Sequence, residues 1–249
     1  MIGKKITTFP PLQEGVLLKR YKRFLADVKL DTGETVTAHC ANTGPMKGVL
    51  SPGGRVRLRH VSSPSRKLSW TWEQAQVTSE KGQCWVGVNT SLPNKIVRKA
   101  IEAGCLRKEL GDILEIKNEV IYGRNKKSRI DLFLIPHKNN EDSRSIFVEI
   151  KNTTWTKGNK ALFPDTITTR GQKHLKEMIG ELPHSRSILI PCISRNDVDV
   201  FVPGDSADPT YGELFRLALS SGVEVIPCCF SFFVDHITWE GVIAFQERE

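Results

Sequence analysis

Hydrophobic and polar residues alternate with a period of two over much of the first third of the chain. The clearest case is residues 55–61, where the pattern places Arg55, Arg57 and Arg59 on one face of a predicted strand. The segment Asp31-Thr32-Gly33-Glu34 is typical of a tight turn between two strands. Similar β-type runs cover residues 16–18, 21–30, 35–39, 67–72 and 74–77. About five short strands without a convincing helical stretch predict a small closed β-barrel, for which the OB fold is the common architecture.

From about residue 83 the pattern changes to strands that alternate with helices. Apolar residues recur at helical spacing over 93–103 and 170–179, and a third helix should begin at Asp208-Pro209, run to Ser220 and end at Gly222. Strands are predicted over residues 115–122, 129–135, 145–151, 187–193 and 223–228. This order predicts a mixed central sheet flanked by helices. We therefore divide the chain into a basic OB-type domain, 1–82, and an α/β domain, 83–249.

The excess positive charge lies entirely in the first of these domains. Residues 1–82 contain 14 Lys and Arg against 6 Asp and Glu, and this excess of 8 equals the net charge of the whole chain, +8. Such asymmetry indicates a module for a polyanion joined to a neutral module with another task. The alternative is a basic surface that only keeps the protein in solution.

Composition also bears on where the protein works. No run approaches the ~18 consecutive apolar residues of a membrane span. The start of the chain leads into Phe9-Pro10-Pro11 and not into the apolar core of a signal peptide. We expect a cytoplasmic, nucleoid-associated protein that does not insert into a membrane. Its six cysteines form no C-x-x-C pair, which favours reduced, mostly buried thiols over a zinc site.

The strongest chemical signal is a set of charged residues inside two apolar strand segments. Asp131 lies in Ser128–Phe133, and Glu149 and Lys151 lie in Phe147–Asn152. Unpaired buried charges are costly, so these side chains need partners or a metal ion. Glu149 and Lys151 are two residues apart and therefore project from the same face of their strand.

If Asp131 lies on the neighbouring strand, the three side chains converge on one site. Two carboxylates suit Mg²⁺ (or Mn²⁺), which would activate a water for attack on a phosphodiester, and Lys151 could position that water. Glu119 is a further acidic candidate. This D-x(n)-E-x-K pattern resembles the PD-(D/E)XK nuclease superfamily. The alternative is a structural ion pair, either Asp131–Lys151 or Glu149–Arg129.

Basic residues at two places are candidates for nucleic-acid contacts. Arg170 and His174 share one face of the predicted helix that follows the strand of Glu149. His174 could carry a proton near neutral pH. The alternative is that these residues reflect helix capping and a surface histidine. In the barrel, basic and aromatic residues interleave, as in single-strand binders whose basic side chains contact phosphates and whose rings stack on bases. The alternative is that the rings pack in the core of the barrel. The nucleic-acid candidates are Lys19, Arg20, Tyr21, Lys22, Arg23, Arg55, Arg57, Arg59, Arg129 and Arg170.

Several multi-residue motifs in a fixed order resemble the sugar fermentation stimulation protein A family. They include residues 18–24, 39–46, 87–90 with Pro93-Asn94, 128–131, 148–152, 163–165 with 169–175, and Asp208-Pro209-x-Tyr211. The resemblance implies an N-terminal OB barrel, a C-terminal PD-(D/E)XK domain with Asp131, Glu149 and Lys151 at its centre, DNA binding, and a bacterial role in regulating sugar (maltose) metabolism. Residues 125–127 form an apparent insertion, and Cys40-Ala41 stands where the family often has a proline.

Two functions follow as hypotheses. In the first, the chain is a Mg²⁺-dependent nuclease whose barrel grips single- or double-stranded DNA while the α/β core cuts it. In the second, it is a non-catalytic DNA-binding regulator that keeps the nuclease-like fold. An RNA-directed protein is a weaker third option, because OB barrels bind either nucleic acid. No helix-turn-helix is evident, and the sequence leaves homo-oligomerisation open.

Overall fold

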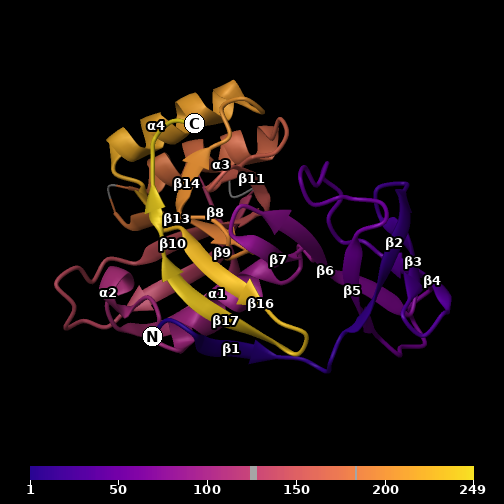
Figure 1. Cartoon of the computed structure of the whole chain (residues 1–249). Coiled ribbons are helices and arrows are strands. Elements are labelled where there is room, and N and C mark those ends of the chain that lie inside the picture. The colour runs from indigo at the N-terminus through magenta and orange to yellow at the C-terminus, as the bar shows by residue number, and fades with distance from the viewer. Residues whose placement is uncertain (124–127, 183) are drawn as a thin grey trace.

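The protein was analysed as a computed structural model that describes residues 1–123, 128–182 and 184–249. The apparent insertion at 125–127 lies outside the described residues. Within them, a β-barrel stands beside an α/β domain (Figure 1).

The barrel consists of short antiparallel strands whose alternate side chains meet in one core. Its sheet runs in the order β4-β3-β2-β5-β6-β7, and a parallel pairing of β4 with β6 closes it. Leu17, Val28, Leu58 and Trp72 are among the apolar residues buried inside. The strands are β2 (Gln13–Tyr21), β3 (Leu25–Leu30), β4 (Thr35–His39), β5 (Arg55–His60), β6 (Trp70–Ser79) and β7 (Gly82–Gly87). The predicted OB-type barrel is thus confirmed.

One predicted strand of the barrel is in fact interrupted by the turn of a hairpin. The run from Tyr21 to Leu30 breaks after Tyr21, and β3 starts only at Leu25. Lys22 and Arg23 take positive φ angles of 49° and 65°, which reverse the chain between β2 and β3. Alternation of apolar residues did not reveal this reversal because neither residue is one of the usual turn formers.

The α/β domain is built on a mixed sheet in the order β1-β17-β16-β13-β10-β9-β8, with β15 beside β13. The pairs β10–β13 and β13–β16 are parallel, while β9–β10 is antiparallel. The strands are β1 (Lys4–Thr8), β8 (Ile113–Tyr122), β9 (Ser128–Pro136), β10 (Ile146–Thr153), β13 (Arg186–Ile193), β15 (Glu224–Val225), β16 (Cys228–Phe232) and β17 (His236–Val242). A smaller sheet packs against it, with β11 (Trp155–Lys157), β12 (Lys160–Phe163), β14 (Val200–Pro203) and β18 (Ala244–Phe245).

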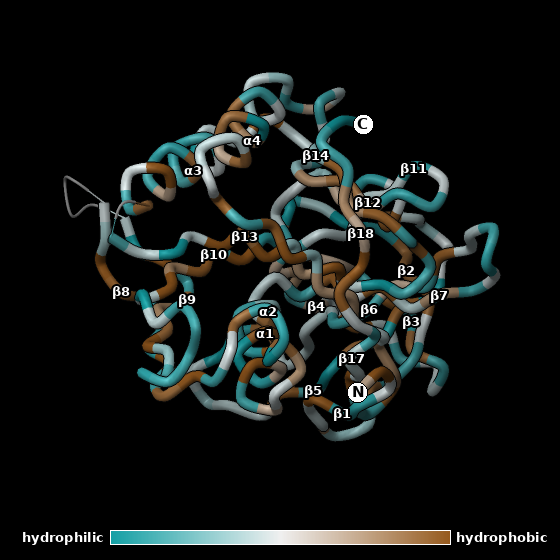
Figure 2. The backbone as a smooth tube through the Cα atoms, turned by 90° about the vertical axis from the view of Figure 1, so that its left-hand side faces the viewer, coloured by the Kyte–Doolittle hydropathy of each residue, from teal (hydrophilic) through white to brown (hydrophobic). Residues whose placement is uncertain are grey.

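Helices cover both faces of the large sheet, as Figure 2 shows for the apolar strands β10 and β13. Helices α1 (Pro93–Glu102) and α2 (Arg107–Leu110) lie on one side, and α3 (Thr169–Glu181) and α4 (Pro209–Ser221) lie on the other. In β13, Ile188 and Ile190 join the core under α1, whereas Leu189 joins the core under α3 and α4. A strand buried on both faces reads as a continuous apolar run, which is what the sequence shows here.

The N-terminal segment does not belong to the barrel to which we assigned it. Strand β1 pairs with β17, so residues 4–8 complete the edge of the large sheet. At the other end of the barrel, β7 pairs with β6 as far as Gly87, five residues beyond the predicted boundary at 82. The pairing of the two chain ends is non-local, and a short polar-flanked segment such as residues 4–8 carries no signal for it.

All six cysteines lie in the described part of the chain and are free thiols, and all except Cys105 are buried. This confirms the expectation that the cysteines are mostly buried. Among the described residues, no helix has the length and apolar character needed to cross a membrane.

Candidate active site

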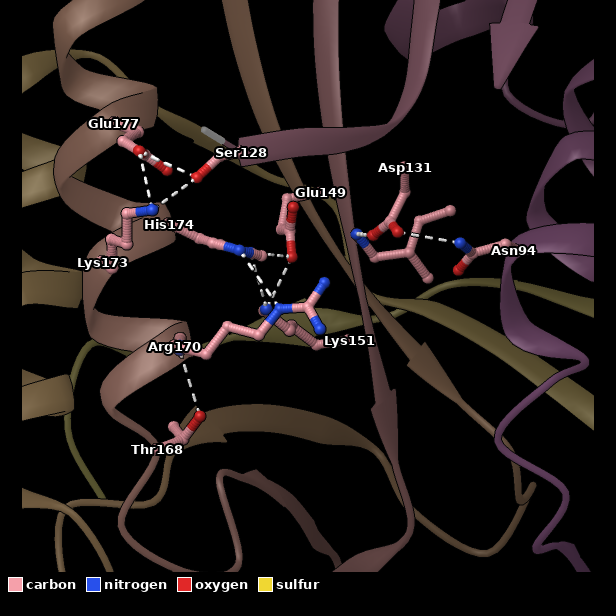
Figure 3. Close-up of polar contacts among 12 residues, drawn as sticks. Asn94, Ser128, Asp131, Glu149, Lys151, Thr168, Arg170, Lys173, His174 and Glu177 are labelled. Atoms are coloured by element: carbon pink, nitrogen blue, oxygen red, sulfur yellow. Dashed lines mark hydrogen bonds and ion pairs between the residues drawn. The ribbon is translucent and has the colours of Figure 1, made fainter. Parts of the chain in front are cut away.

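The three residues of the predicted nuclease centre come together on two neighbouring strands. Asp131 lies on β9 and Glu149 and Lys151 lie on β10, which pair side by side (Figure 3). The Lys151 Nζ donates to Glu149 Oε1 over 2.6 Å, so the two side chains share a face as predicted. The Glu149 charge also acts on the Asp131 carboxyl, which places both carboxylates in one electrostatic environment.

Asp131 is held by hydrogen bonds to its two oxygens. Its Oδ2 accepts from the backbone N–H of Ile150 at 2.7 Å, and its Oδ1 accepts from Asn94 Nδ2 at 2.8 Å. Burial, followed by the nearby Glu149 charge, raises the pKa of Asp131 from 3.8 to about 6, against the opposing effect of these hydrogen bonds. A carboxyl with such a pKa loses its proton readily when a cation approaches.

Glu149 is almost fully buried, and one of its oxygens has no partner among the residues that the structure describes. Its Oε1 meets Lys151 and His174, whereas its Oε2 is buried without a hydrogen bond in the described part of the chain. Burial alone would raise the pKa of Glu149, but the Lys151 charge and then the His174 hydrogen bond outweigh it and hold the pKa below its usual value. An anionic oxygen that is buried and unpartnered is costly, and a bound cation would remove that cost.

His174 orients Glu149 from the opposite side of the site. The His174 ring is buried, with Nδ1 at 2.5 Å from Glu149 Oε1, and Arg170 Nε donates to its Nε2 at 3.4 Å. His174 thus contacts Glu149 through one ring nitrogen and Arg170 through the other, which fixes the orientation of its ring. The alternative of a surface histidine is therefore wrong.

Helix α3 brings His174 to this position because its first turn is capped. The side-chain oxygen of Thr168 accepts from the backbone N–H of Gly171 at 3.1 Å. The Asp208 carboxylate, which caps α4, also accepts from the backbone N–H of Thr168 at 2.9 Å. One buried aspartate thus ties the starts of both helices together.

A cleft of 600 Å³ opens beside His174, the residue that contacts Glu149. Arg129, Arg170 and Lys173 line it together with His174 and Glu119. In the described part of the chain, neither Arg129 nor Arg170 forms an ion pair with a carboxylate, so their charge is available at the cleft. Glu119 is exposed on β8 with a φ of 54°, at the rim and not in the buried cluster.

The ion pairs considered as a structural alternative differ from those observed. Within the described residues, Lys151 pairs with Glu149 and not with Asp131, and Arg129 does not pair with Glu149. Asn94, at the second position of α1, was missed as the partner of Asp131. Its motif with Pro93 stood out in the sequence, but an asparagine in a first helical turn is usually interpreted as a capping residue.

Most of the arginines expected to bind nucleic acid on the barrel are already paired. Arg55 bonds to Asp31 and Glu14, and Arg57 bonds to Glu14 and stacks on the Trp85 ring at 3.7 Å. The three arginines of β5 do share one face, but that face is neutralised by acidic partners. For Arg59, the partner is the buried carboxylate of Glu73.

The basic and aromatic segment of β2 divides into structural and exposed members. Arg20 donates to the backbone carbonyls of Asn42 and Gly44, and so fixes the 42–46 loop. Lys19 pairs with Asp27 at 3.4 Å, and the Tyr21 hydroxyl donates to the same carboxylate. Lys22 and Arg23 lie exposed in the hairpin turn.

Comparisons with known proteins cover nearly the whole chain. Residues 91–235 match a family model described as the sugar fermentation stimulation protein RE domain, and residues 18–88 match one described as the SfsA N-terminal OB domain. A sugar fermentation stimulation protein homolog from a strain of Prochlorococcus marinus is 74% identical and covers 100% of this chain and 99% of its own length. One from Synechococcus sp. (strain WH7803) is 64% identical, covering 100% and 98%. A solved structure of Pyrococcus furiosus SfsA in complex with Ca²⁺ is 25% identical, with a TM-score of 0.83 and coverage of 98% and 99%.

Proposed function

Since this chain belongs to the sugar fermentation stimulation protein family, we propose that it is a divalent-metal-dependent nuclease that binds DNA and hydrolyses its phosphodiester bonds. The proposal is supported above all by the buried Oε2 of Glu149, which has no hydrogen-bond partner in the described part of the chain and lies beside Asp131 and Lys151. Neighbouring carboxylates of this kind are the oxygen ligands that Mg²⁺ and Mn²⁺ take.

Asp131 and Glu149 would hold the cation. When bound there, it would supply charge neutralisation at a phosphodiester and acidify a water molecule. The Pyrococcus furiosus relative, described as a complex with Ca²⁺, supports a divalent cation in this fold. The donor set fits as well, since both residues present carboxylate oxygens and Asp131 gives up its proton near pH 6.

The other residues of the site have roles set by their contacts. Lys151 is held beside the carboxylates by Glu149 and can orient the attacking water and stabilise negative charge that develops on the phosphate. His174 keeps Glu149 in position, which makes it a positioning residue. Arg129 and Arg170 at the cleft, and Lys22 and Arg23 on the barrel, are suited to contact phosphates of the strand.

The alternative is a DNA-binding regulator without catalytic activity. It is favoured by the fact that Lys151 and His174 already satisfy Glu149 Oε1, as a purely structural network would. The family's association with sugar fermentation is compatible with either function.

Cleavage of DNA by a single-residue variant separates the two. We expect the parent protein to cut plasmid or single-stranded DNA in Mg²⁺ or Mn²⁺, and Glu149→Gln to lower the rate by about 10²–10³-fold because a preorganised charge is lost at the reacting phosphate. Glu115→Gln is the matched control, since Glu115 is exposed on β8 and its one ion pair among the described residues is with Lys117. A pure parent protein that binds DNA but never cuts it in either metal would reject the nuclease and favour the regulator.

A further inference from the structure

Three sequence motifs that the metal site does not use meet in one pocket. Asn42 comes from the loop after β4, Thr90 from the segment between barrel and α1, and Phe163 and Asp165 from the end of β12. Asn152, at the end of β10, completes the polar lining. The motifs are far apart in the sequence, and the pocket lies where the barrel meets the α/β domain.

The pocket is built around fixed polar groups. Asn42 Oδ1 accepts from the backbone N–H of Gly44 at 2.9 Å, and Asn152 Oδ1 accepts from the Ser194 hydroxyl at 2.9 Å. Both asparagines are thereby locked in orientation, and no described residue accepts from either amide nitrogen. The carboxylate of Asp165 is met by the backbone N–H groups of Met46 and of Asp165 itself, and no described side chain donates to it.

Aromatic rings form the apolar walls. Trp155 and Phe163 line the pocket, and Lys47 lies over the Trp155 ring at 4.7 Å. The volume is 200 Å³, below the ~300–1,000 Å³ of pockets for drug-sized ligands. A small planar ring system with hydrogen-bonding edges matches this size and lining better than a whole nucleotide does.

The position of the pocket relates it to the metal site. Asn152 follows Lys151 directly on β10, and Lys151 Nζ lies 5.8 Å from the centre of the Phe163 ring. A strand whose phosphate lies at Lys151 would therefore carry the neighbouring base past Phe163. Amide and carboxyl groups can pair with the Watson–Crick edge of an unstacked base, and aromatic walls can take its faces.

We propose that this pocket binds one nucleobase of the DNA strand, unstacked next to the phosphate held at the metal site. The inference rests on the proposed DNA binding and deepens it, because it makes a single-stranded or locally opened strand the preferred substrate. The pocket would then fix which phosphate reaches Lys151.

The test measures binding of the full-length protein to short single-stranded oligonucleotides by fluorescence anisotropy, with Ca²⁺ as the cation. One base at a time is replaced by an abasic residue along the strand. We expect one position to weaken binding by about tenfold, because stacking of one base contributes ~1–3 kcal/mol. Free nucleoside monophosphates in the same assay should compete only weakly, because they lack the remaining phosphate contacts.

Variants of the protein show whether the sensitive position of the oligonucleotide is the one whose base occupies the pocket. Thr90 is exposed, and among the described residues its hydroxyl bonds only to the Ala41 carbonyl. Thr90→Phe should therefore fill the pocket without unfolding the chain and should remove the position dependence. Thr32→Phe, at an exposed position in the turn between β3 and β4 and outside the pocket, is the matched control and should keep it, as should the parent. Thermal unfolding checks that each variant is folded.

The outcomes separate this inference from the proposed function. Binding that is equal for all abasic positions, or a position dependence that persists in folded Thr90→Phe, overturns the base pocket and leaves DNA binding intact. Competition by a nucleoside monophosphate as strong as that of the strand would overturn it too and assign the pocket to a free nucleotide. Absence of any DNA binding by the parent rejects the proposed function itself.

Discussion

At the scale of a single residue, the buried carboxyl of Asp131 suits a cation but lowers the stability of the folded protein when it is ionised. Its carboxyl is buried next to Glu149, and its pKa in the folded chain is about 6 against an ordinary value of 3.8. Between these two pH values the folded protein binds more protons than the unfolded one. The stabilisation from this group is therefore fully present below about pH 4 and is lost as the pH rises through about 6.

Neutralising this residue should stabilise the metal-free protein. In the presence of a chelator near neutral pH, we expect Asp131→Asn to raise the free energy of unfolding by up to about 3 kcal/mol, because a tenfold change in proton affinity corresponds to ~1.36 kcal/mol. The Asn94 amide can turn to meet the new side chain. Urea unfolding at several pH values measures the effect, and the gain should shrink toward pH 4.

Asp142 provides a contrast with the opposite sign. Hydrogen bonds from Arg144 lower its pKa to about 2, so Asp142→Asn should cause a small loss of stability near neutral pH.

Added Mg²⁺ should raise the stability of the parent protein and not that of Asp131→Asn, since only the parent keeps both carboxylates. If metal-free Asp131→Asn is less stable than the metal-free parent, that result contradicts the raised pKa of Asp131.

The residue types of the site could be predicted, but their partners could not. Spacing alone placed Glu149 and Lys151 on one face, because a strand alternates strictly. The contacts of Asp131 with Asn94 and of His174 with Glu149 join segments 37 and 25 residues apart, and only the fold brings them together. For the same reason, the acidic partners of the β5 arginines were not foreseen.

At the scale of elements, Asp208 connects the starts of α3 and α4. Its buried carboxylate accepts from the backbone N–H groups of Thr168 and Tyr211 and from the side-chain amide of Gln172. The Thr168 cap is a single bond to Gly171. The loss of Asp208 therefore leaves three donors without this partner, one buried and two partly buried, whereas the loss of the Thr168 hydroxyl leaves one.

Two cap variants should differ in stability accordingly. We expect Thr168→Ala to cost about 1 kcal/mol and Asp208→Ala about 3 kcal/mol, measured by urea unfolding. Both should also slow DNA cleavage, because α3 carries His174. Ser220→Ala, at an exposed hydroxyl near the end of α4, is the control and should change stability by less than about 0.5 kcal/mol. Equal effects of the two cap variants would show that Asp208 does not link the helices.

The elements with strong periodicity were predicted close to their observed bounds, and short ones were not. The helix expected over 93–103 is α1, and the cap at Asp208 and the stop at Gly222 are as predicted. The strand expected over 223–228 is divided into β15 and β16, since Pro227 between them has no N–H for a ladder. Strands β11, β12, β14 and β18 have two to four residues each, too few for a period to show.

At the scale of the whole molecule, the large sheet depends on both ends of the chain. Strand β1 pairs with β17, and Ile6 and Phe9 pack against the core under α1. Lys99 Nζ on α1 also donates to the Thr7 hydroxyl at 2.7 Å. The α/β domain therefore includes residues that precede the barrel, and the segment 83–249 alone lacks an edge strand.

Removal of residues 1–11 should destabilise the protein without touching the active site. Loss of Ile6 and Phe9 from the core costs about 3 kcal/mol, which lowers the melting temperature by roughly 10 °C in a chain of this size. Light scattering should also rise on heating, because β17 becomes an exposed edge strand through which molecules can aggregate. Removal of Met1 and Ile2 alone, both exposed, is the control. An unchanged melting temperature after the longer deletion would argue against the β1–β17 pairing.

The pairing of β1 with β17 has a consequence for the order in which the parts of this protein fold during synthesis. The barrel, residues 13–87, is contiguous and can form as soon as it emerges, whereas β1, synthesised before it, has no partner until residues 236–242 arrive. Strand β1 therefore stays unpaired until β17 has been synthesised, and this edge of the large sheet forms after the barrel.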